Sequence, residues 1–315
     1  MTATLATMPQ ETSSVPAKIA RAGAARPEPL HFQIGRVAVS LRCSVRSVRR
    51  DFETLYGPYR QARKPDGAVE LEVRRTGRFP RLRPKYVLRL FGQDHYSVDR
   101  ASSILPYIEW AVNYGVISAN LGYYQMHASV MQHGDMGFVF AGSPGSGKST
   151  LAAGLLARGW KYLCDEFALI DPESGLVHPY PKALCAKADA HPVYRRLGLP
   201  LPRARKYLKG AKGLVSFLNP LEVRPDAVGS ACPVRCILLP RYEPGAEPEL
   251  EPISRAECAF LLNGLSFNFS HFRERGIDLL ADLVRGAECY RLRSGDIQAT
   301  CDLIDELRGR IGLAC

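Results

Sequence analysis

The sequence predicts an α/β fold, and three features of its middle section lead to that prediction. A short apolar segment at residues 137–141 is followed by a glycine-rich loop and then by a helical segment rich in Ala and Leu. Further short apolar segments and amphipathic helical segments follow it, as a sheet covered by helices requires. We expect a twisted mixed sheet with helices in residues 121–315, preceded by a smaller α+β module in residues 28–120.

Short strands and one helix are expected in the first 120 residues. Residues 1–27 are rich in Ala, Thr, Ser and Pro without periodicity, which predicts a disordered leader. The run V-E-L-E-V alternates with period two, and apolar residues from Val45 to Leu55 recur every three to four positions. The expected strands are Phe32–Leu41, Ala68–Arg74 and Tyr86–Phe91; Val45–Leu55 is an expected helix, and residues 101–121 have helical spacing.

The second part of the chain shows the strand and helix patterns more clearly. Gly137–Ala141 is an expected buried strand, and the composition of Leu151–Arg158 favours a helix. Later strands are expected at Tyr162–Cys164, Phe167–Ile170 and Cys236–Leu239, and later helices at Arg255–Leu265, Gly276–Val284 and Ile297–Ile311.

Composition bounds the class of protein. Of the 315 residues, 46% are hydrophobic and 23% charged, which is typical of a globular chain with a substantial core. We expect no membrane span, because no stretch of eighteen or more apolar residues occurs. The nine cysteines are scattered without a C-x-x-C pair, which favours reduced thiols and a cytoplasmic location.

The basic character of the chain lies in its first third. Residues 1–100 hold 19 Lys and Arg against 9 Asp and Glu, a surplus of ten, out of a net charge of +11 for the whole chain. Such a surplus attracts acidic partners, but here the basic residues alternate with apolar ones, which favours a solvated basic face. No nucleic-acid-binding motif accompanies the charge, so we expect no nucleic-acid partner.

The glycine-rich loop carries the strongest functional signal. Its pattern G-x-x-x-x-G-K-[ST] is typical of a phosphate-binding P-loop when a strand precedes it and a helix follows. Glycines let the backbone N–H groups approach phosphate oxygens, the lysine neutralises the β- and γ-phosphates, and the following hydroxyl binds Mg²⁺. We therefore expect ATP and Mg²⁺ at Gly142, Ser143, Pro144, Gly145, Ser146, Gly147, Lys148, Ser149 and Thr150.

An acidic pair follows the loop and its helix. Asp165 and Glu166 come directly after the expected strand at residues 162–164, fifteen residues beyond Thr150. A helix of that length returns the chain to the phosphate end of the sheet. Neighbouring side chains on a strand point to opposite faces, so only one carboxylate faces the γ-phosphate, and we expect it to be Asp165.

These segments resemble the HPr kinase/phosphorylase family, and most closely its branch of HPr-kinase-related kinases of type A. The resemblance rests on His127-Ala128-Ser129, on the loop, and on the string Arg158-Gly159-Trp160 that continues to the acidic pair. Glu109-Trp110 with Asn113, Pro240-Arg241-Tyr242 and Ser266-Phe267-Asn268 are similar too. The likeness covers about residues 28–300 and is most specific over 127–170.

The resemblance implies a P-loop kinase fold and transfer of the γ-phosphoryl of ATP to a hydroxyl, such as a serine of a small protein. It implies that Asp165 takes the proton of the attacking hydroxyl and that His127 lies beside the γ-phosphate. Ser149, Asp165 and Glu166 are the implied metal ligands. Lys187, Lys212 and Arg241 are candidates for a cationic clamp on phosphoryl oxygens. Relatives form oligomers, so a homo-oligomer is expected.

The chain departs from the family pattern in two places. The second acid of the pair is Glu166, where the family has Asp. The family has an E-I-R-G element, linked to dephosphorylation, soon after the acidic pair. The only similar segment here, Leu221-Glu222-Val223-Arg224, lies much farther along the chain, so phosphorylase activity is not expected.

Three functions therefore stay open at this point. A kinase of a protein or peptide hydroxyl comes first, and a kinase of a sugar- or polyol-type small molecule is the second. The third is a nucleotide-binding switch or ATPase, which the basic first hundred residues would suit.

Overall fold

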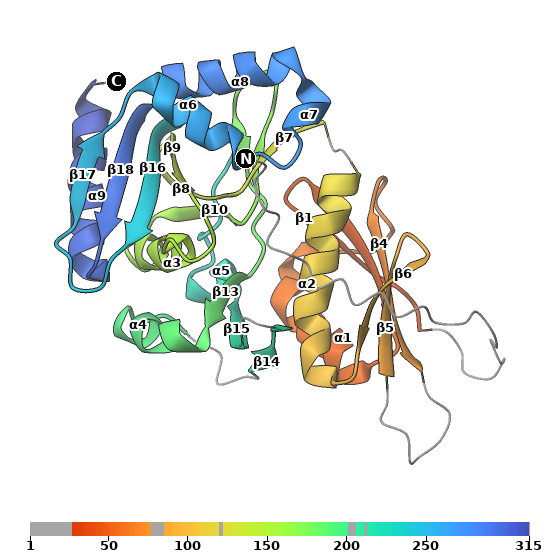
Figure 1. Cartoon of the computed structure of the whole chain (residues 1–315). Coiled ribbons are helices and arrows are strands. Elements are labelled where there is room, and N and C mark those ends of the chain that lie inside the picture. The colour runs from red at the N-terminus through yellow and green to blue at the C-terminus, as the bar shows by residue number, and fades with distance from the viewer. Residues whose placement is uncertain (1–26, 77–84, 120–121, 201–205, 211–212, 315) are drawn as a thin grey trace.

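The computed structural model describes residues 27–76, 85–119, 122–200, 206–210 and 213–314. Its architecture is mixed α/β, with parallel and antiparallel pairs in the same sheets (Figure 1). The described strands form two six-stranded sheets and two three-stranded ones. The expected leader at residues 1–27 lies outside the described residues except for Pro27.

The first six-stranded sheet occupies the front of the chain, with strand order β3-β1-β2-β4-β5-β6. Its pairs are antiparallel except β2 with β4. Alternating residues of β4, namely Val69, Leu71 and Val73, are buried beneath helices, while the glutamates between them face outward. The elements are β1 (Leu30–Ile34), β2 (Val37–Cys43), α1 (Arg46–Tyr56), η1 (Gly57–Tyr59), β3 (Arg60–Gln61), β4 (Val69–Thr76), β5 (Lys85–Leu90), β6 (Gln93–Val98) and α2 (Ala101–Ser118).

The second six-stranded sheet has the order β10-β8-β9-β16-β18-β17. Strands β9, β16 and β18 are parallel, whereas β10, β8 and β17 are antiparallel to their neighbours. The elements are β8 (Ala128–His133), β9 (Met136–Ala141), α3 (Lys148–Ala157), β10 (Lys161–Asp165), β16 (Val234–Tyr242), β17 (Glu249–Pro252), α6 (Arg255–Asn263), α8 (Glu274–Arg285), β18 (Glu288–Ser294) and α9 (Ile297–Ala314).

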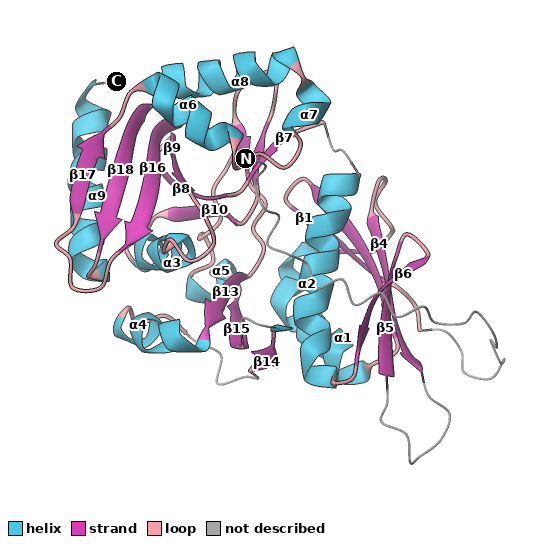
Figure 2. Cartoon of the chain, in the orientation of Figure 1, coloured by secondary structure: helices cyan, strands magenta, loops and turns pink. Residues whose placement is uncertain are grey.

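Helices cover both faces of this second sheet (Figure 2). Phe138 and Phe140 of β9 lie in the core that includes α3 and α9, whereas Val139 between them belongs to the core that includes α6 and α8. Burial on both faces of the sheet explains why the sequence of β9 is continuously apolar from Phe138 to Ala141. The parallel strands therefore end together at the edge where the glycine-rich loop begins.

Short elements complete the described chain. Strands β7, β11 and β12 form one small sheet, and β13, β14 and β15 form the other. Their bounds, with those of the short helices, are β7 (Tyr124–Met126), β11 (Ala168–Ile170), β12 (Val177–His178), β13 (Leu184–Lys187), η2 (Ala188–Ala190), α4 (His191–Arg196), β14 (Tyr207–Leu208), β15 (Leu214–Leu218), α5 (Pro220–Val223) and α7 (Phe269–Phe272).

The structure corrects the sequence prediction at several elements. The expected strand Phe32–Leu41 is a hairpin of β1 and β2, because Gly35 turns the chain with a positive φ of 58°. Strands β6, β7 and β8 were not predicted. Side chains from α1 and α2 share one buried core with β8 and β9. The expected division of the chain into two domains near residue 120 stays a prediction.

Gly35 joins the first sheet to the later part of the chain. A Cβ at this position would lie 2.0 Å from the carbonyl oxygen of Pro179, in addition to the strain of its φ. We expect Gly35→Ala to lower the free energy of unfolding by about 2–3 kcal/mol, measured by urea denaturation. The matched control is Gly57→Ala, where φ is −49° and no atom lies within 4 Å of the new Cβ. Equal stability of the two variants would contradict this contact.

Candidate functional site

The glycine-rich loop, residues 142–150, connects the end of β9 to the start of α3. Gly145 and Gly147 have φ values of 93° and 99°, which side-chain-bearing residues rarely adopt. Gly147 is the N-cap of α3, and no side chain caps this helix end. The first N–H groups of α3 and the positive end of its dipole therefore face the loop, as anion binding requires.

Lys148 is folded into the loop that precedes it. Its Nζ donates to the carbonyl oxygens of Gly142, at 2.7 Å, and Ser143, at 2.9 Å. The side chain is buried, with only 7% of the residue exposed. The ammonium group of Lys148 therefore lies where the loop would surround a phosphate group. The hydroxyl of Ser146 is also buried there and has no hydrogen-bond partner, which leaves a donor for a bound anion.

Asp165 is a buried carboxyl beside the start of α3. It ends β10 opposite Ser129 of β8, whose hydroxyl donates a hydrogen bond to it. Burial raises the pKa of Asp165 above the ordinary value of 3.8, and the charge of Glu166 adds to this effect. Hydrogen bonds from Ser129 and Ser149 and the charge of Lys148 lower the pKa only in part. The carboxyl is therefore suited to accept a proton nearer neutral pH.

The raised pKa makes the stability of the protein depend on pH. Asp165 binds a proton more tightly in the folded chain than in the unfolded one. Its contribution to stability is therefore fully present below pH 3.8 and is lost as pH rises through the folded-state pKa. We expect Asp165→Asn to be more stable than wild type without ligand, by a margin that grows as pH rises above the ordinary carboxyl pKa of 3.8 in urea denaturation. A margin that is constant with pH would contradict the raised pKa.

Glu166 turns away to a different partner. Its carboxylate accepts a hydrogen bond from the side-chain amide of Asn113 on α2, and its backbone has a φ of 126°. Positive φ at a residue other than glycine is strained and persists only where its surroundings hold it. The two carboxylates therefore have different neighbours: Asp165 lies beside the start of α3, and Glu166 contacts α2.

A buried polar network continues from Asn113 into the front of the chain. Lys182 donates to the side chain of Asn113 and forms an ion pair with Glu109 of α2, with 3.0 Å between Nζ and Oε2. The hydroxyl of Tyr56 on α1 donates to the other carboxylate oxygen of Glu109 at 2.8 Å. All four residues are less than 9% exposed. The network therefore connects α1 and α2 to Glu166 through buried hydrogen bonds.

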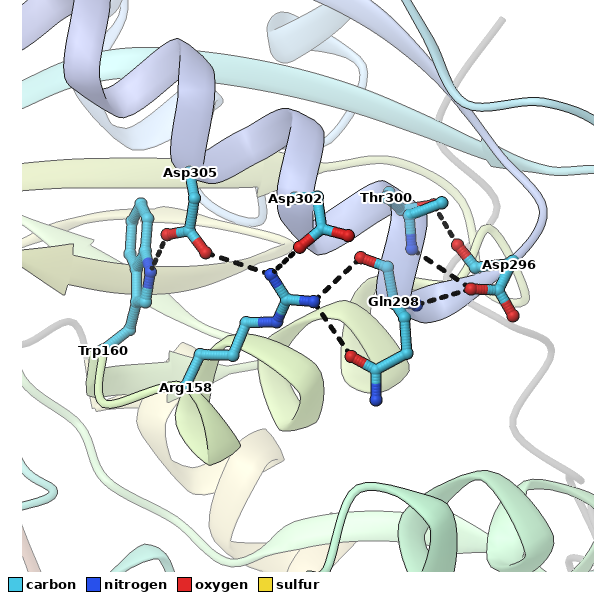
Figure 3. Close-up of polar contacts among 8 residues, drawn as sticks. Arg158, Trp160, Asp296, Gln298, Thr300, Asp302 and Asp305 are labelled. Atoms are coloured by element: carbon cyan, nitrogen blue, oxygen red, sulfur yellow. Dashed lines mark hydrogen bonds and ion pairs between the residues drawn. The ribbon is translucent and has the colours of Figure 1, made fainter.

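The string Arg158-Gly159-Trp160 anchors the far end of α3 to α9 (Figure 3). Arg158 contacts Asp302 at 2.5 Å and Asp305 at 3.2 Å, and donates to the backbone oxygen of Gln298 at 2.9 Å. The indole N–H of Trp160 donates to Asp305 at 2.9 Å. These contacts fix the helix that carries the loop and the strand that carries Asp165, so the string has a structural role.

The other four residues predicted for the site have different surroundings. His127 is half-buried between β7 and β8, with its ring 5.8 Å from that of Phe267. Arg241 is 82% exposed in its side chain, forms an ion pair with Glu243 and lines a pocket with the loop. Lys187 is exposed at the end of β13. Lys212 lies outside the described residues. The roles of these four residues stay predictions.

Two buried lysines were missed from the sequence. Lys182 is 4% exposed and Lys209 is 2% exposed, with its Nζ 3.5 Å from Cys185 Sγ and 5.6 Å from the centre of the Trp110 ring. Nothing in a lysine's own position separates a buried one from a surface one. The usable signal was the setting of Lys182, within an otherwise apolar run from Pro179 to Ala186.

Within the described ranges, every helix is too short or too polar to cross a lipid bilayer. The eight cysteines in those ranges are all free thiols. Those ranges also contain no cluster of three or more His, Cys, Asp or Glu side chains arranged to hold a metal ion.

Comparison with known proteins finds likeness among solved structures, although no match was found by sequence. Neither the protein-family models nor the curated proteins include a match to this sequence. The structure is similar to the HPr(Ser) kinase/phosphatase from Coxiella burnetii, with a TM-score of 0.31 and 13% sequence identity. The similarity covers 61% of this chain and 99% of that one. At this level no family is assigned from it, and the family likeness in the sequence stays a resemblance.

Proposed function

We propose that this chain is an ATP-dependent phosphotransferase that transfers the γ-phosphoryl group of ATP to a hydroxyl. One observation carries the proposal. A buried carboxyl, Asp165, accepts a hydrogen bond from Ser129 and lies beside Ser149, the residue that follows the loop lysine at the start of α3. A proton acceptor and a phosphate-binding loop therefore meet at one helix terminus.

The loop fits a chain of phosphates. Gly145 and Gly147, both with positive φ, add no side chain to the loop, and the N-terminal N–H groups of α3 face it. On binding, Lys148 would exchange its two carbonyl partners for phosphate oxygens, and the unpartnered Ser146 hydroxyl would donate to one. The interaction of Lys148 with phosphate is charge-assisted, so the exchange is favourable.

The residues also fit Mg²⁺. The hydroxyl of Ser149 and the carboxylate of Asp165 are neighbouring hard oxygen donors. Mg²⁺ needs only one or two protein ligands when phosphates and water complete its shell. When bound, it would neutralise negative charge on the transferring phosphates. Glu166 would act by holding the strand end through Asn113, since its carboxylate faces α2.

The reaction requires one proton transfer by this chain. The acceptor hydroxyl would give its proton to Asp165 as its oxygen bonds to the γ-phosphorus, and the bond from that phosphorus to the β–γ bridging oxygen would break, releasing ADP. Lys148 would stabilise the charge that develops on the phosphates. His127 would donate a hydrogen bond to the γ-phosphate, as the sequence resemblance implies.

The acceptor is proposed from the sequence resemblance, which favours a serine of a small protein or peptide. A small molecule of the sugar or polyol type is the alternative.

The test is transfer of labelled γ-phosphate from ATP with Mg²⁺ to extract fractions separated into proteins and small molecules. Wild type is compared with Lys148→Ala and, as a control, with Lys85→Ala at an exposed lysine on β5. We expect labelling with wild type that falls by about 100-fold or more with Lys148→Ala. The labelled fraction identifies the class of acceptor.

Two results would contradict the proposal. The first is ATP binding without label in either fraction. The second is hydrolysis of ATP at equal rates by wild type and an Asp165→Asn variant, which would favour a nucleotide-dependent switch.

A further inference from the structure

A buried lysine that the proposed mechanism does not use lies against a thiol and two aromatic rings. Lys209 directly follows β14 and is 2% exposed. Its Nζ lies 3.5 Å from Cys185 Sγ, and 5.6 Å and 5.9 Å from the ring centres of Trp110 and Phe217. Of these three described partners, only the thiol can carry a negative charge. Because a buried ammonium group is costly unless it is paired, Lys209 favours an ionised Cys185.

The small sheet of β13, β15 and β14 holds the two side chains together. Cys185 of β13 is directly opposite Phe217 of β15, and the backbone N–H of Lys209 donates to the carbonyl oxygen of Gly213 at 2.9 Å. The neighbours of Cys185 along β13 belong to the core that includes α3, whereas Cys185 itself packs against the core that includes α2. The thiol and the ammonium group therefore meet on the side of β13 that faces α2, where Trp110 lies.

The ammonium group of Lys209 keeps its charge although it is buried. Burial lowers the pKa of Lys209, but the charge of Cys185 and a hydrogen bond to its sulfur act in the opposite direction. The charges of Glu166 and Glu109 also raise this pKa, which lies above the ordinary value of 10.5. These two carboxylates oppose a further anion nearby, but the described hydrogen bond of Lys209 goes to Cys185.

Two other titratable groups lie near Cys185. Lys187 is two residues along β13, on the same face of the strand, and is exposed. Tyr194 of α4 is close enough for the charge of Cys185 to act on it. Burial raises the pKa of Tyr194 above the ordinary value of 10, so its phenol stays neutral. The cation on β13 therefore favours a thiolate, and the phenol on α4 does not oppose it.

Cys185 is also the accessible thiol. Of the eight cysteines in the described ranges, it alone is partly exposed, and the other seven are buried. Burial raises the pKa of Cys43 to about 11 and those of Cys232 and Cys301 to about 12. A reagent dissolved in water should therefore react at Cys185 before it reacts at these buried thiols.

We propose that Cys185 and Lys209 form a thiolate–ammonium pair, which makes Cys185 a site of modification by peroxides and other electrophiles. The sulfur would attack one oxygen of hydrogen peroxide, so that an S–O bond forms and the O–O bond breaks. The hydroxide that leaves would take the proton of the sulfenic acid, giving a sulfenate and water. The sulfur is oxidised, the peroxide is reduced, and the sulfenate stays paired with Lys209. This inference does not depend on the proposed function.

The test is the rate at which iodoacetamide alkylates Cys185 against pH, followed by mass spectrometry of its peptide. The thiolate is the reacting form, and an unperturbed thiol with a pKa of about 8.5 is only a few per cent ionised at about pH 7. We expect native wild type to react at about pH 7 at more than about half its rate at high pH. Lys209→Met removes the charge and should lower the rate at about pH 7 by about tenfold or more. Lys187→Met is the matched control and should change it by less than about twofold, because solvent and salt screen an exposed charge.

The same peptide in urea-unfolded wild type gives the reference for an unpaired thiol, and this comparison needs no variant to fold. Equal pH dependence in the native and unfolded chains, or no reaction in the native protein, would overturn the inference. Equal effects of Lys209→Met and Lys187→Met would overturn it as well.

A second arm treats the native protein with limiting hydrogen peroxide and traps sulfenic acid with dimedone. We expect dimedone at Cys185 in wild type, and about tenfold less of it in Lys209→Met. Dimedone found at the buried cysteines and not at Cys185 would contradict the proposed site.

Discussion

Asp165→Asn should lower the rate of phosphoryl transfer by about 10²- to 10⁴-fold, the range attributed to a general base. The amide keeps the shape of the carboxyl and accepts a hydrogen bond from Ser129, but it cannot take the proton of the acceptor. The Kd of ATP measured without Mg²⁺ should change by only a few-fold, because the loop and Lys148 are unaltered. Single-turnover transfer, measured with ATP bound in advance, separates these two quantities.

Ser129→Ala provides the matched comparison for this prediction. It keeps the carboxyl but removes a hydrogen bond that lowers the pKa of Asp165. We therefore expect the rising limb of the rate against pH to move to higher pH, with the maximal rate largely retained. If Asp165→Asn keeps more than about a tenth of the wild-type rate, Asp165 is not the base.

Lys182→Met should lower the free energy of unfolding by about 3–5 kcal/mol, since it leaves a buried carboxylate without its cation. Glu109 is 3% exposed, and its other partner is the hydroxyl of Tyr56, which cannot neutralise a charge. The matched control is Lys187→Met, five residues along the chain at an exposed position. It should change stability by less than about 0.5 kcal/mol in the same urea denaturation experiment.

A second variant tests whether the loss comes from the unpaired charge. Adding Glu109→Gln to Lys182→Met removes that charge and should recover part of the lost stability, as a double-mutant cycle measures. Equal effects of Lys182→Met and Lys187→Met would show that the ion pair contributes nothing. Because Lys182 also holds Asn113 against Glu166, transfer activity should fall in the single variant even where the protein stays folded.

Structure that depends on neighbouring residues in the sequence could be predicted. The strand, loop and helix around Gly142–Thr150 are encoded within about twenty consecutive residues, by apolar content, glycines and helix propensity. The helix at Val45–Leu55 follows from its own spacing in the same way, and the structure places α1 there with one residue shifted at each end. Short-range patterns need no knowledge of the rest of the fold.

Contacts between residues that are far apart in the sequence could not be predicted. Lys182 and Glu109 are 73 residues apart, and only the packing of α2 against the later chain brings them together. Sequence reasoning instead chose Lys187, which has the same chemistry but an exposed position. The break at Gly35 was missed because the flanking strands are both apolar and read as one segment. The pocket beside the loop combines residues 141–146 with residues between 239 and 293, which are far apart in the sequence.

The position of a bound nucleotide decides whether Asp165 can act as the base at the glycine-rich loop. A crystal structure with Mg²⁺ and a non-hydrolysable ATP analogue should place the terminal phosphate between Lys148 and Asp165. A terminal phosphate that lies away from Asp165, or an analogue bound away from the glycine-rich loop, would contradict the proposed function.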